Sequence, residues 1–195
     1  MSEALTEKTL TECDTLEVET RHFIACAFPG ADLIEWRTDH AIFEQCTFVG
    51  TRLSHSRHGQ SAFLNCRFRG ANLFDASFED CRMVGTQFEE CQWDHVNIQR
   101  GDWSYASLRY ARIPGANFDS ARLTEADFTE AILRGASFQH ADLTRAVFAK
   151  ARIQNVDFRG AIIEGIDFRH LDLQGVHFDL AQAPYVLSCY GALID

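Results

Sequence analysis

Carboxylates are the most concentrated reactive groups of the sequence, and six of them gather within a twenty-residue window. The window 75–94 holds these acids against the single base Arg82, which gives it a net charge of −5. General acid–base catalysis would need two of the carboxylates together in a cleft. Spread over a surface, they would serve solubility or offer a negative field to a basic groove. The six acids are Asp75, Glu79, Asp80, Glu89, Glu90 and Asp94.

Cysteine and histidine are the other residues that could carry chemistry, as metal ligands or nucleophiles. The seven cysteines and eight histidines form no CxxC pair and no cluster with the spacing of a metal site. His58 stands in a polar run, residues 54–60, where a solvated side chain is a simpler expectation than a catalytic one. The sequence also lacks a phosphate-binding glycine loop, a G-x-S-x-G motif and an H-E-x-x-H helix. We therefore predict no enzymatic activity, no cofactor and no metal site.

A period of five residues organises the chain that carries these groups. From Phe23 to Phe178 a centre residue recurs at every fifth position, 32 times, and only Thr38 and His58 among these centres are polar. Neither the alternation of a strand nor the spacing of a helix fits this period. Five residues can form one short extended side that ends in a turn, and a chain of such sides stacks coil on coil as a solenoid.

Like residues also recur every twenty positions, which predicts four sides per coil and eight coils. One column is phenylalanine apart from a single leucine, and a second is aliphatic apart from Trp93. Five cysteines take the small inward position two residues before a centre, where a free thiol packs as a small apolar group. Trp36 is too large for this position beside Thr38, and residues 54–60 around His58 are polar throughout, so bulged corners are expected at Thr38 and His58. Phe128 should point inward and Thr129 should face water. The five cysteines are Cys26, Cys46, Cys66, Cys81 and Cys91.

The repeated A-(D/N)-L-x-x pattern resembles that of the pentapeptide repeat family. The resemblance implies an all-β fold, a right-handed quadrilateral parallel β-helix with a short C-terminal helix. Within the family, residues 167–169, 172–176, 179 and 182–183 resemble the last coil and helix start of Qnr proteins, and residues 61–63, 65–66, 68 and 81–83 resemble MfpA. The resemblance therefore implies a DNA-mimicking homodimer that binds DNA gyrase or topoisomerase IV and does not itself bind nucleic acid.

The sequence departs from many Qnr proteins, because no inserted loop breaks the phase of five. If such loops displace a drug, protection against quinolones is in doubt. A rod without loops also resembles the self-immunity proteins of organisms that make gyrase-poisoning peptides. The alternative function is a pentapeptide repeat scaffold with no topoisomerase partner.

Three segments are expected. Residues 1–20 hold six acids and one lysine, and they form either an acidic arm or a degenerate first coil with Cys13 and Val18 in phase. Residues 21–179 form the β-helix, and residues 180–195 form a helix and tail that cap the rod and join two copies. The candidate topoisomerase contacts are the six acids of the window with Asp167, Asp172 and Asp179. The candidate dimer contacts are Leu180, Pro184, Tyr185, Leu187, Tyr190, Leu193 and Ile194.

The overall charge limits how the chain could imitate DNA. The chain carries −10 in total, but residues 21–180 hold 21 acids and 17 bases. A duplex of similar length would carry one charge per about 1.7 Å, so mimicry would have to rely on where the acids are placed. No apolar run approaches the ~20 residues of a membrane span, and no signal peptide is evident. A cytoplasmic protein without membrane contact is expected.

Overall fold

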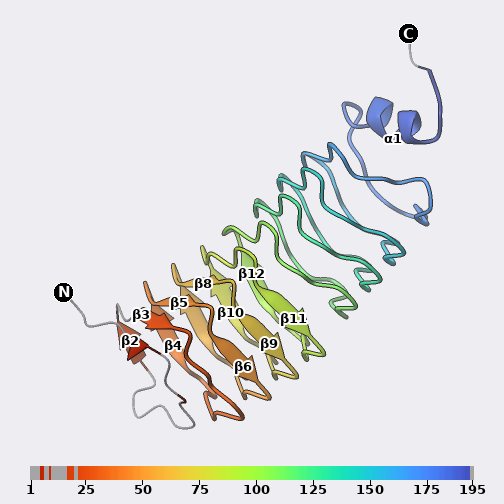
Figure 1. The fold of residues 1–195 in the computed structure, drawn as a ribbon. Coiled ribbons are helices and arrows are strands. Elements are labelled where there is room, and N and C mark those ends of the chain that lie inside the picture. Colours follow the sequence, from red (N-terminus) through yellow and green to blue (C-terminus); the bar gives the residue numbers. More distant parts are fainter. Residues whose placement is uncertain (1–4, 7–8, 10–16, 20–21, 194–195) are drawn as a thin grey trace.

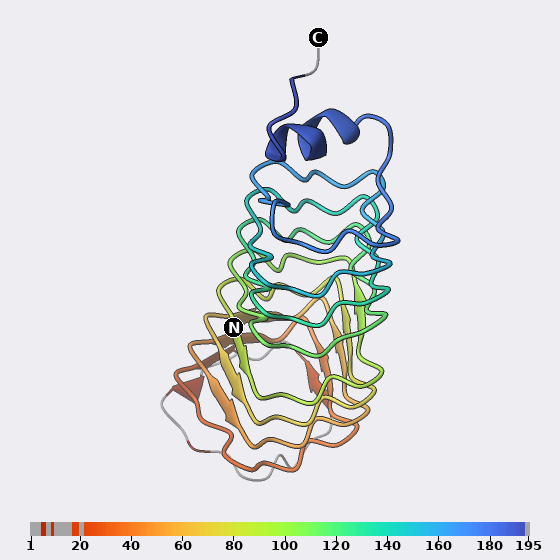
Figure 2. The same cartoon turned by 90° about the vertical axis from the view of Figure 1, so that its right-hand side faces the viewer.

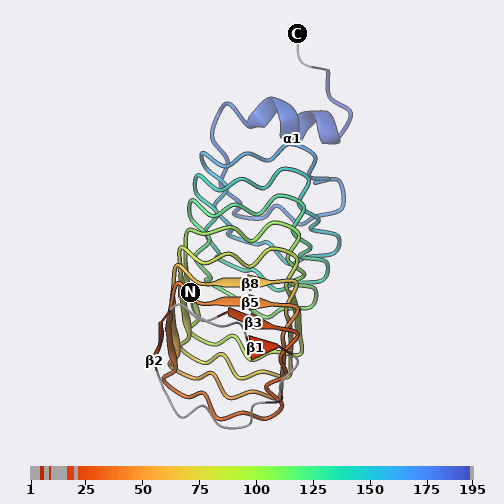
Figure 3. The ribbon, with the colours of Figure 1, turned by 60° about the vertical axis from the view of Figure 1, so that its left-hand side comes forward.

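The chain winds into a rod of stacked coils, a parallel β-solenoid that ends in one short helix, α1 (Ala183–Cys189) (Figure 1). The structure, a computed structural model, describes residues 5–6, 9, 17–19 and 22–193. Figure 2 and Figure 3 show the coils stacked along one axis, with α1 lying across the last of them. The predicted all-β solenoid with a C-terminal helix is therefore confirmed.

Each coil has four sides, and equivalent sides of successive coils form four faces of the rod. The first face holds β1 (Leu5–Thr6), β3 (His22–Ile24), β5 (Ile42–Glu44) and β8 (Ala62–Leu64). The second face holds β6 (Thr47–Val49), β9 (Arg67–Arg69) and β11 (Gln87–Glu89). The third face has single bridges, beginning with Asp32↔Arg52. The fourth face holds β2 (Glu17–Glu19), β4 (Arg37–Asp39), β7 (Arg57–Gly59), β10 (Ser77–Glu79) and β12 (Asn97–Gln99).

Successive coils are offset by twenty residues, as the columns of like residues predict. Phe43 pairs with Phe63 on the first face, and Asp157 still pairs with His177 near the C-terminal end. The last three-residue strand is β12. Such strands therefore occupy about four of the eight predicted turns. The later coils pair through single bridges instead. At the N-terminal end the offset differs, because Leu5 of β1 pairs with Phe23 of β3. Cys13, predicted to be in phase, lies outside the described residues.

The centre residues of the repeat form the core. Nearly all described centres are buried, and the small residue two positions earlier is buried beside them. Phe28 stacks on Phe48 with 4.7 Å between ring centroids, and Phe48 stacks on Phe68 at 4.5 Å. Paired strands lie about 4.8 Å apart, so like rings can stack coil upon coil. Most sides end in a residue with positive φ, and at Gly30, where φ is 61°, the missing Cβ avoids strain.

Two sides that were predicted to bulge are regular. Thr38 pairs with His58 in the ladder between β4 and β7, and no extra residue enters either strand. Trp36 is fully buried at the small inward position, because the small centre Thr38 leaves room for the indole in a close-packed core. The indole meets the ring of Phe43 edge-on at 5.4 Å. The prediction of bulged corners is therefore wrong.

Two side chains predicted to face water are buried. His58 is 2% exposed and Thr129 is 9% exposed. His58 occupies a centre position and pairs in register with Phe78 of the next coil, so its ring belongs to the core column of the fourth face. The backbone N–H of Thr129 donates to Oδ1 of Asp127 at 2.8 Å, which holds Thr129 in a tight turn. Solvation of His58 and exposure of Thr129 are both corrected.

Helix α1 covers the open end of the solenoid. Its N-cap residue Gln182 is buried, and Nε2 of Gln182 donates to the carbonyl oxygens of Phe158 and Ala161 at 2.7 and 2.8 Å. The hydroxyl of Tyr190 donates to the carbonyl oxygen of Phe168 at 2.8 Å. These side chains satisfy backbone groups that an uncapped last coil would leave unpaired. Among the described residues, no helix combines the length and apolar character needed to cross a bilayer.

Candidate partner-binding surfaces

The six acids of the window 75–94 are spread over three faces of the rod rather than gathered in one patch. Glu79 and Asp80 follow the centre of β10 on the fourth face. Glu89 and Glu90 follow the centre of β11 on the second face, half a coil away. The remaining two acids, Asp75 and Asp94, belong to the third face. A flat basic surface could therefore contact only some of these acids at once.

Arginines from neighbouring coils neutralise several of these acids. Arg100 lies 2.7 Å from Oδ2 of Asp80 and 3.2 Å from Oε1 of Glu79. Arg57 lies 2.9 Å from Oδ2 of Asp75. The hydrogen bonds from Arg100 and Arg57 lower the pKa values of Asp80 and Asp75, respectively. Neither arginine falls inside the sequence window, so the local field is weaker than its net charge of −5 suggests.

The three candidate acids near the C-terminal end also lie on different faces. Asp167 is held by its neighbour Arg169, whose Nη2 lies 2.6 Å from Oδ2 of the carboxylate. Asp172 accepts a hydrogen bond from Nε2 of Gln154 at 2.8 Å, and this bond lowers the pKa of Asp172. Asp179 accepts a hydrogen bond from the backbone N–H of Gly160 at 2.8 Å. The structure brings these acids to one end of the rod but not into one cluster.

The fourth face carries a longer row of acids that the sequence window does not reveal. This row runs from the second described coil to the last, with arginines between its members. Sorting the sequence into its twenty-residue columns would have found the row. Arg159 donates to Asp157 in the row and lowers the pKa of that carboxyl to about 2. The acids are Asp39, Glu79, Asp80, Asp119, Asp157 and Asp179, and the arginines are Arg37, Arg57, Arg100 and Arg159.

Apolar side chains are exposed around α1. Leu180 is 93% exposed, Leu187 is 49% exposed and Leu193 is 94% exposed. Pro184 is also exposed, whereas the hydroxyl of Tyr185 is 2.7 Å from the backbone nitrogen of Gly165 and serves the cap. Tyr190 is half exposed but also bonds the last coil. Ile194 lies outside the described residues.

The cysteines behave as packing groups. Cys26, Cys46, Cys66 and Cys81 are buried, and Cys91 is partly buried. Burial raises the pKa of the Cys81 thiol to about 12 and that of Cys91 to about 11, so both thiols stay protonated and unreactive at neutral pH. Within the described part of the chain, no group of three or more histidine, cysteine or acidic residues is placed to hold a metal ion.

These features define a class of protein, a filled solenoid of five-residue repeats with charged faces and a capped end. The family model for the pentapeptide repeat region matches residues 16–108, 71–148 and 111–186, and the chain belongs to the pentapeptide repeat family. Comparison with curated proteins gives no match.

Solved pentapeptide repeat proteins share the fold along most of the chain. Two trypsin-treated forms of QnrB1, described as a plasmid-mediated fluoroquinolone resistance protein, match with TM-scores of 0.86 and 0.88 at 21% identity. Each match covers 98% of this chain and 97% of the QnrB1 chain. Full-length QnrB1 gives a TM-score of 0.59 at 21% identity, covering 97% and 100% of the two chains. HetL, a heterocyst-differentiation protein of the cyanobacterium Nostoc sp. strain PCC 7120, gives 0.66 at 24% identity, covering 89% and 86%.

Proposed function

We propose that this protein is a DNA mimic that binds a bacterial type II topoisomerase and modulates the enzyme or protects it from gyrase-targeting antibiotics or toxins. The observation that carries this proposal is the likeness in shape to QnrB1, which spans 98% of this chain and includes the capped C-terminal end. A fluoroquinolone acts on a topoisomerase, so a protein of this shape that confers resistance points to the same partner. The proposed partner also places the protein in the cytoplasm.

The row of acids on the fourth face supports competition with DNA for a basic groove. Neighbouring coils lie about 4.8 Å apart, so eight coils give a stiff rod of roughly 38 Å. Acids at fixed heights along such a rod can meet basic side chains that otherwise hold phosphates. The interleaved arginines reduce the total charge, so the position of each acid matters more than the sum.

The exposed leucines around α1 support a homodimer joined at the C-terminal ends. Leu180 and Leu187 are apolar beyond what the cap uses, because Gln182, Tyr185 and Tyr190 already bond the last coil. A two-fold interface presents the same patch from both copies, so one apolar surface can cover itself. Two rods joined in this way would double the length offered to a DNA-binding groove.

A supercoiling assay tests the proposal. Purified gyrase, relaxed plasmid and increasing amounts of the full-length protein would be combined with and without a fluoroquinolone. We expect either loss of supercoiling or rescue from the drug, and competition by added linear duplex DNA. A parallel decatenation assay with topoisomerase IV distinguishes the two enzymes. No effect on either enzyme at any protein concentration would overturn the proposal.

A scaffold function is the second candidate, and the balanced surface charge favours it. Arg57, Arg67 and Arg100 compensate acids on three faces, which weakens the negative field that each face offers to a basic groove. HetL shares the fold and is described as acting in the regulation of differentiation. If this protein affects neither enzyme in the supercoiling and decatenation assays, the scaffold function is favoured.

A further inference from the structure

The hydrogen-bonded ladder of the rod has its widest interruption at one level, where two of the four faces are unpaired. A second gap lies on the second face, between residues 146–150 and 166–170. On the fourth face β12 ends its sheet, and pairing resumes only at Asn117↔Ser137. On the third face pairing stops at Asn72↔Gln92 and resumes at Arg112↔Ile132. Between residues 91–100 and residues 111–120, no backbone hydrogen bond is formed among the described residues. The first and second faces continue across this level, through Asp102↔Arg122 and Ser107↔Asp127.

The next level of the same two faces shows which hydrogen bonds the interrupted level lacks. There, residues 111–120 and residues 131–140 exchange six backbone hydrogen bonds, each 2.8 or 2.9 Å long. The donors are the N–H groups of Ile113, Gly115, Phe118, Ser120, Ile132 and Ser137. The equivalent donors at the interrupted level are the N–H groups of Trp93, His95, Ile98, Arg100, Arg112 and Asn117, and none has a bond across the gap.

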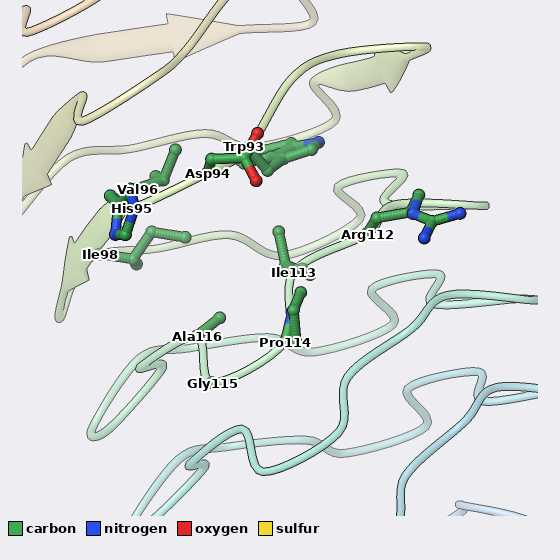
Figure 4. A pocket seen from close by; sticks show the side chains of 10 residues that line it. All are labelled: Trp93, Asp94, His95, Val96, Ile98, Arg112, Ile113, Pro114, Gly115 and Ala116. Carbon is green, nitrogen blue, oxygen red and sulfur yellow. The ribbon is translucent and has the colours of Figure 1, made fainter.

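A cleft of ≈ 260 Å³ opens where the bonds are missing (Figure 4). One lip carries residues 93–98 and the other carries residues 112–116. Val96 and Ala116 occupy small inward positions, which are buried in most coils, yet both are only partly buried here. The cleft therefore reaches these two small inward residues, whereas the centres Trp93, Ile98 and Ile113 stay buried beneath them.

Large side chains hold the lips apart. Trp93 is the aromatic member of an otherwise aliphatic column, between Leu73 and Ile113, and its ring packs 4.7 Å from that of Phe88. Val96 stands where the preceding coil has Ala76. Overfilling a packed core forces the surrounding backbone to shift, and we attribute the separation of the coils at this level to the joint volume of Trp93 and Val96.

Two oppositely charged residues that could form an ion pair lie on the two sides of the cleft. Elsewhere, side chains eighteen residues apart join successive coils, as in Arg57 with Asp75 and Arg109 with Asp127, each at 2.9 Å. Asp94 and Arg112 have the same spacing and lie on opposite lips (Figure 4), but neither forms an ion pair within the described chain. Approach of the lips would bring this pair together and align the six unpaired donors with their acceptors.

We propose that the rod is hinged at this cleft. The two halves, residues 22–100 and 111–178, bend about the continuous first and second faces, and Asp94 with Arg112 latches the closed form. The hinge changes the curvature of the rod without unfolding either half. This device does not depend on the identity of the partner.

Hydrogen exchange on the full-length protein tests whether the cleft is open. The amides of Trp93, His95, Ile98 and Arg100 should exchange at least about 100-fold faster than those of Ile113, Gly115, Phe118 and Ser120, because unbonded, solvent-reached amides lack protection. The two sets occupy equivalent positions one coil apart, so they form a matched comparison. Equal protection of the two sets would overturn the proposal.

Disulfide trapping tests whether the open cleft closes. Asp94→Cys with Arg112→Cys is compared with Thr124→Cys with Asp142→Cys, whose native side chains lie 3.1 Å apart at the same spacing. Under mild oxidation, with mapping by mass spectrometry, the cleft pair should cross-link at roughly 0.1–10% of the control rate, the usual population of a minor conformer. Trp93→Leu should raise this rate towards that of the control.

A negative control sets the background for this experiment. Asp94→Cys with Arg134→Cys spans two coils and should not cross-link within one molecule. Fast amide exchange combined with cleft cross-linking no faster than this background would show a fixed notch and overturn the hinge.

Discussion

Nδ1 of His58 lies 2.7 Å from Oγ1 of Thr38 in the preceding coil, and Nε2 of the same ring lies 3.1 Å from Oγ of Ser56. Both ring nitrogens are therefore hydrogen-bonded inside the core, where a neutral imidazole offers one donor and one acceptor. The ring also stacks on Phe78 at 5.0 Å. Burial lowers the pKa of His58 to about 3, and the positive charge of Arg57 adds to this effect.

Stability should therefore decrease in mild acid because of His58. The unfolded chain binds a proton at this residue near pH 6.5, whereas the folded chain does not until about pH 3. Between these values the free energy of unfolding falls as pH falls, by about 1.4 kcal/mol per pH unit. From pH 6.5 to 5 the expected loss is about 2 kcal/mol, measured by urea unfolding at each pH.

Two variants isolate this contribution. His58→Phe with Thr38→Val continues the aromatic column and removes the titrating group, so its loss between pH 6.5 and 5 should be smaller by about 2 kcal/mol. His140→Gln changes an exposed histidine and should keep the wild-type pH dependence. Equal pH dependence of all three proteins would show that His58 is not kept neutral by folding.

The assigned register predicts opposite effects at two adjacent positions. Phe148 is 2% exposed, so Phe148→Asp places a carboxylate in the core and should lower stability by more than about 4 kcal/mol. Ala149 is exposed, so Ala149→Asp should change stability by less than about 0.5 kcal/mol. Thermal unfolding monitored by circular dichroism checks both values, and similar melting temperatures would contradict the register.

The repeat made most of the fold predictable, because one period sets both the local turn and the stacking partner. A centre such as Phe128 meets Phe148 directly because the offset of twenty puts equivalent residues one above the other. The burial of Trp36 was not predictable in the same way. The large indole fits because the neighbouring centre, Thr38, is small. A rule that treats each position separately does not capture this compensation of volume.

The candidate surfaces were less predictable than the fold, because they depend on contacts between coils. Arg100 neutralises Asp80 from the next coil, so a count of charges within one window overstates the field. The cleft likewise involves two residues of one coil, Trp93 and Val96, and the way in which they meet the next coil. Sorting residues by face recovers the first effect, whereas the second requires the packed structure.

Capping and dimerisation should be separable at the C-terminal end. Gln182→Ala removes two hydrogen bonds to buried carbonyl groups and should cost about 1–3 kcal/mol of stability. Leu180→Glu with Leu187→Glu alters only exposed side chains and should yield folded monomers. Sedimentation velocity and urea unfolding distinguish these effects, with the exposed Gln174→Ala as control. A dimer that persists in the double variant would place the interface elsewhere.

The two acid pairs of the window should differ in their effect on a topoisomerase. Glu79→Gln with Asp80→Asn changes the fourth face, and Glu89→Gln with Glu90→Gln changes the second face. A single basic groove contacts one side of the rod, so we expect the fourth-face variant alone to weaken gyrase binding and its salt dependence. Both variants should fold, because ion pairs between exposed side chains contribute little to stability.

Binding titrations at several salt concentrations measure this difference. Equal weakening by the two variants would contradict contact through one face. Wild-type binding by both variants would show that these acids only solvate the surface.

The interrupted ladder has a mechanical consequence. When the rod is pulled from its two ends, backbone hydrogen bonds hold neighbouring coils together, but none forms on the second face between residues 146–150 and 166–170, and none forms on two whole sides at the level of Trp93 and Ile113. Force applied along the axis therefore concentrates most at the level of Trp93 and Ile113. We expect extension to begin there, followed by release of whole coils of roughly 65 Å of chain each. The cleft would thus determine where a rod under tension first yields.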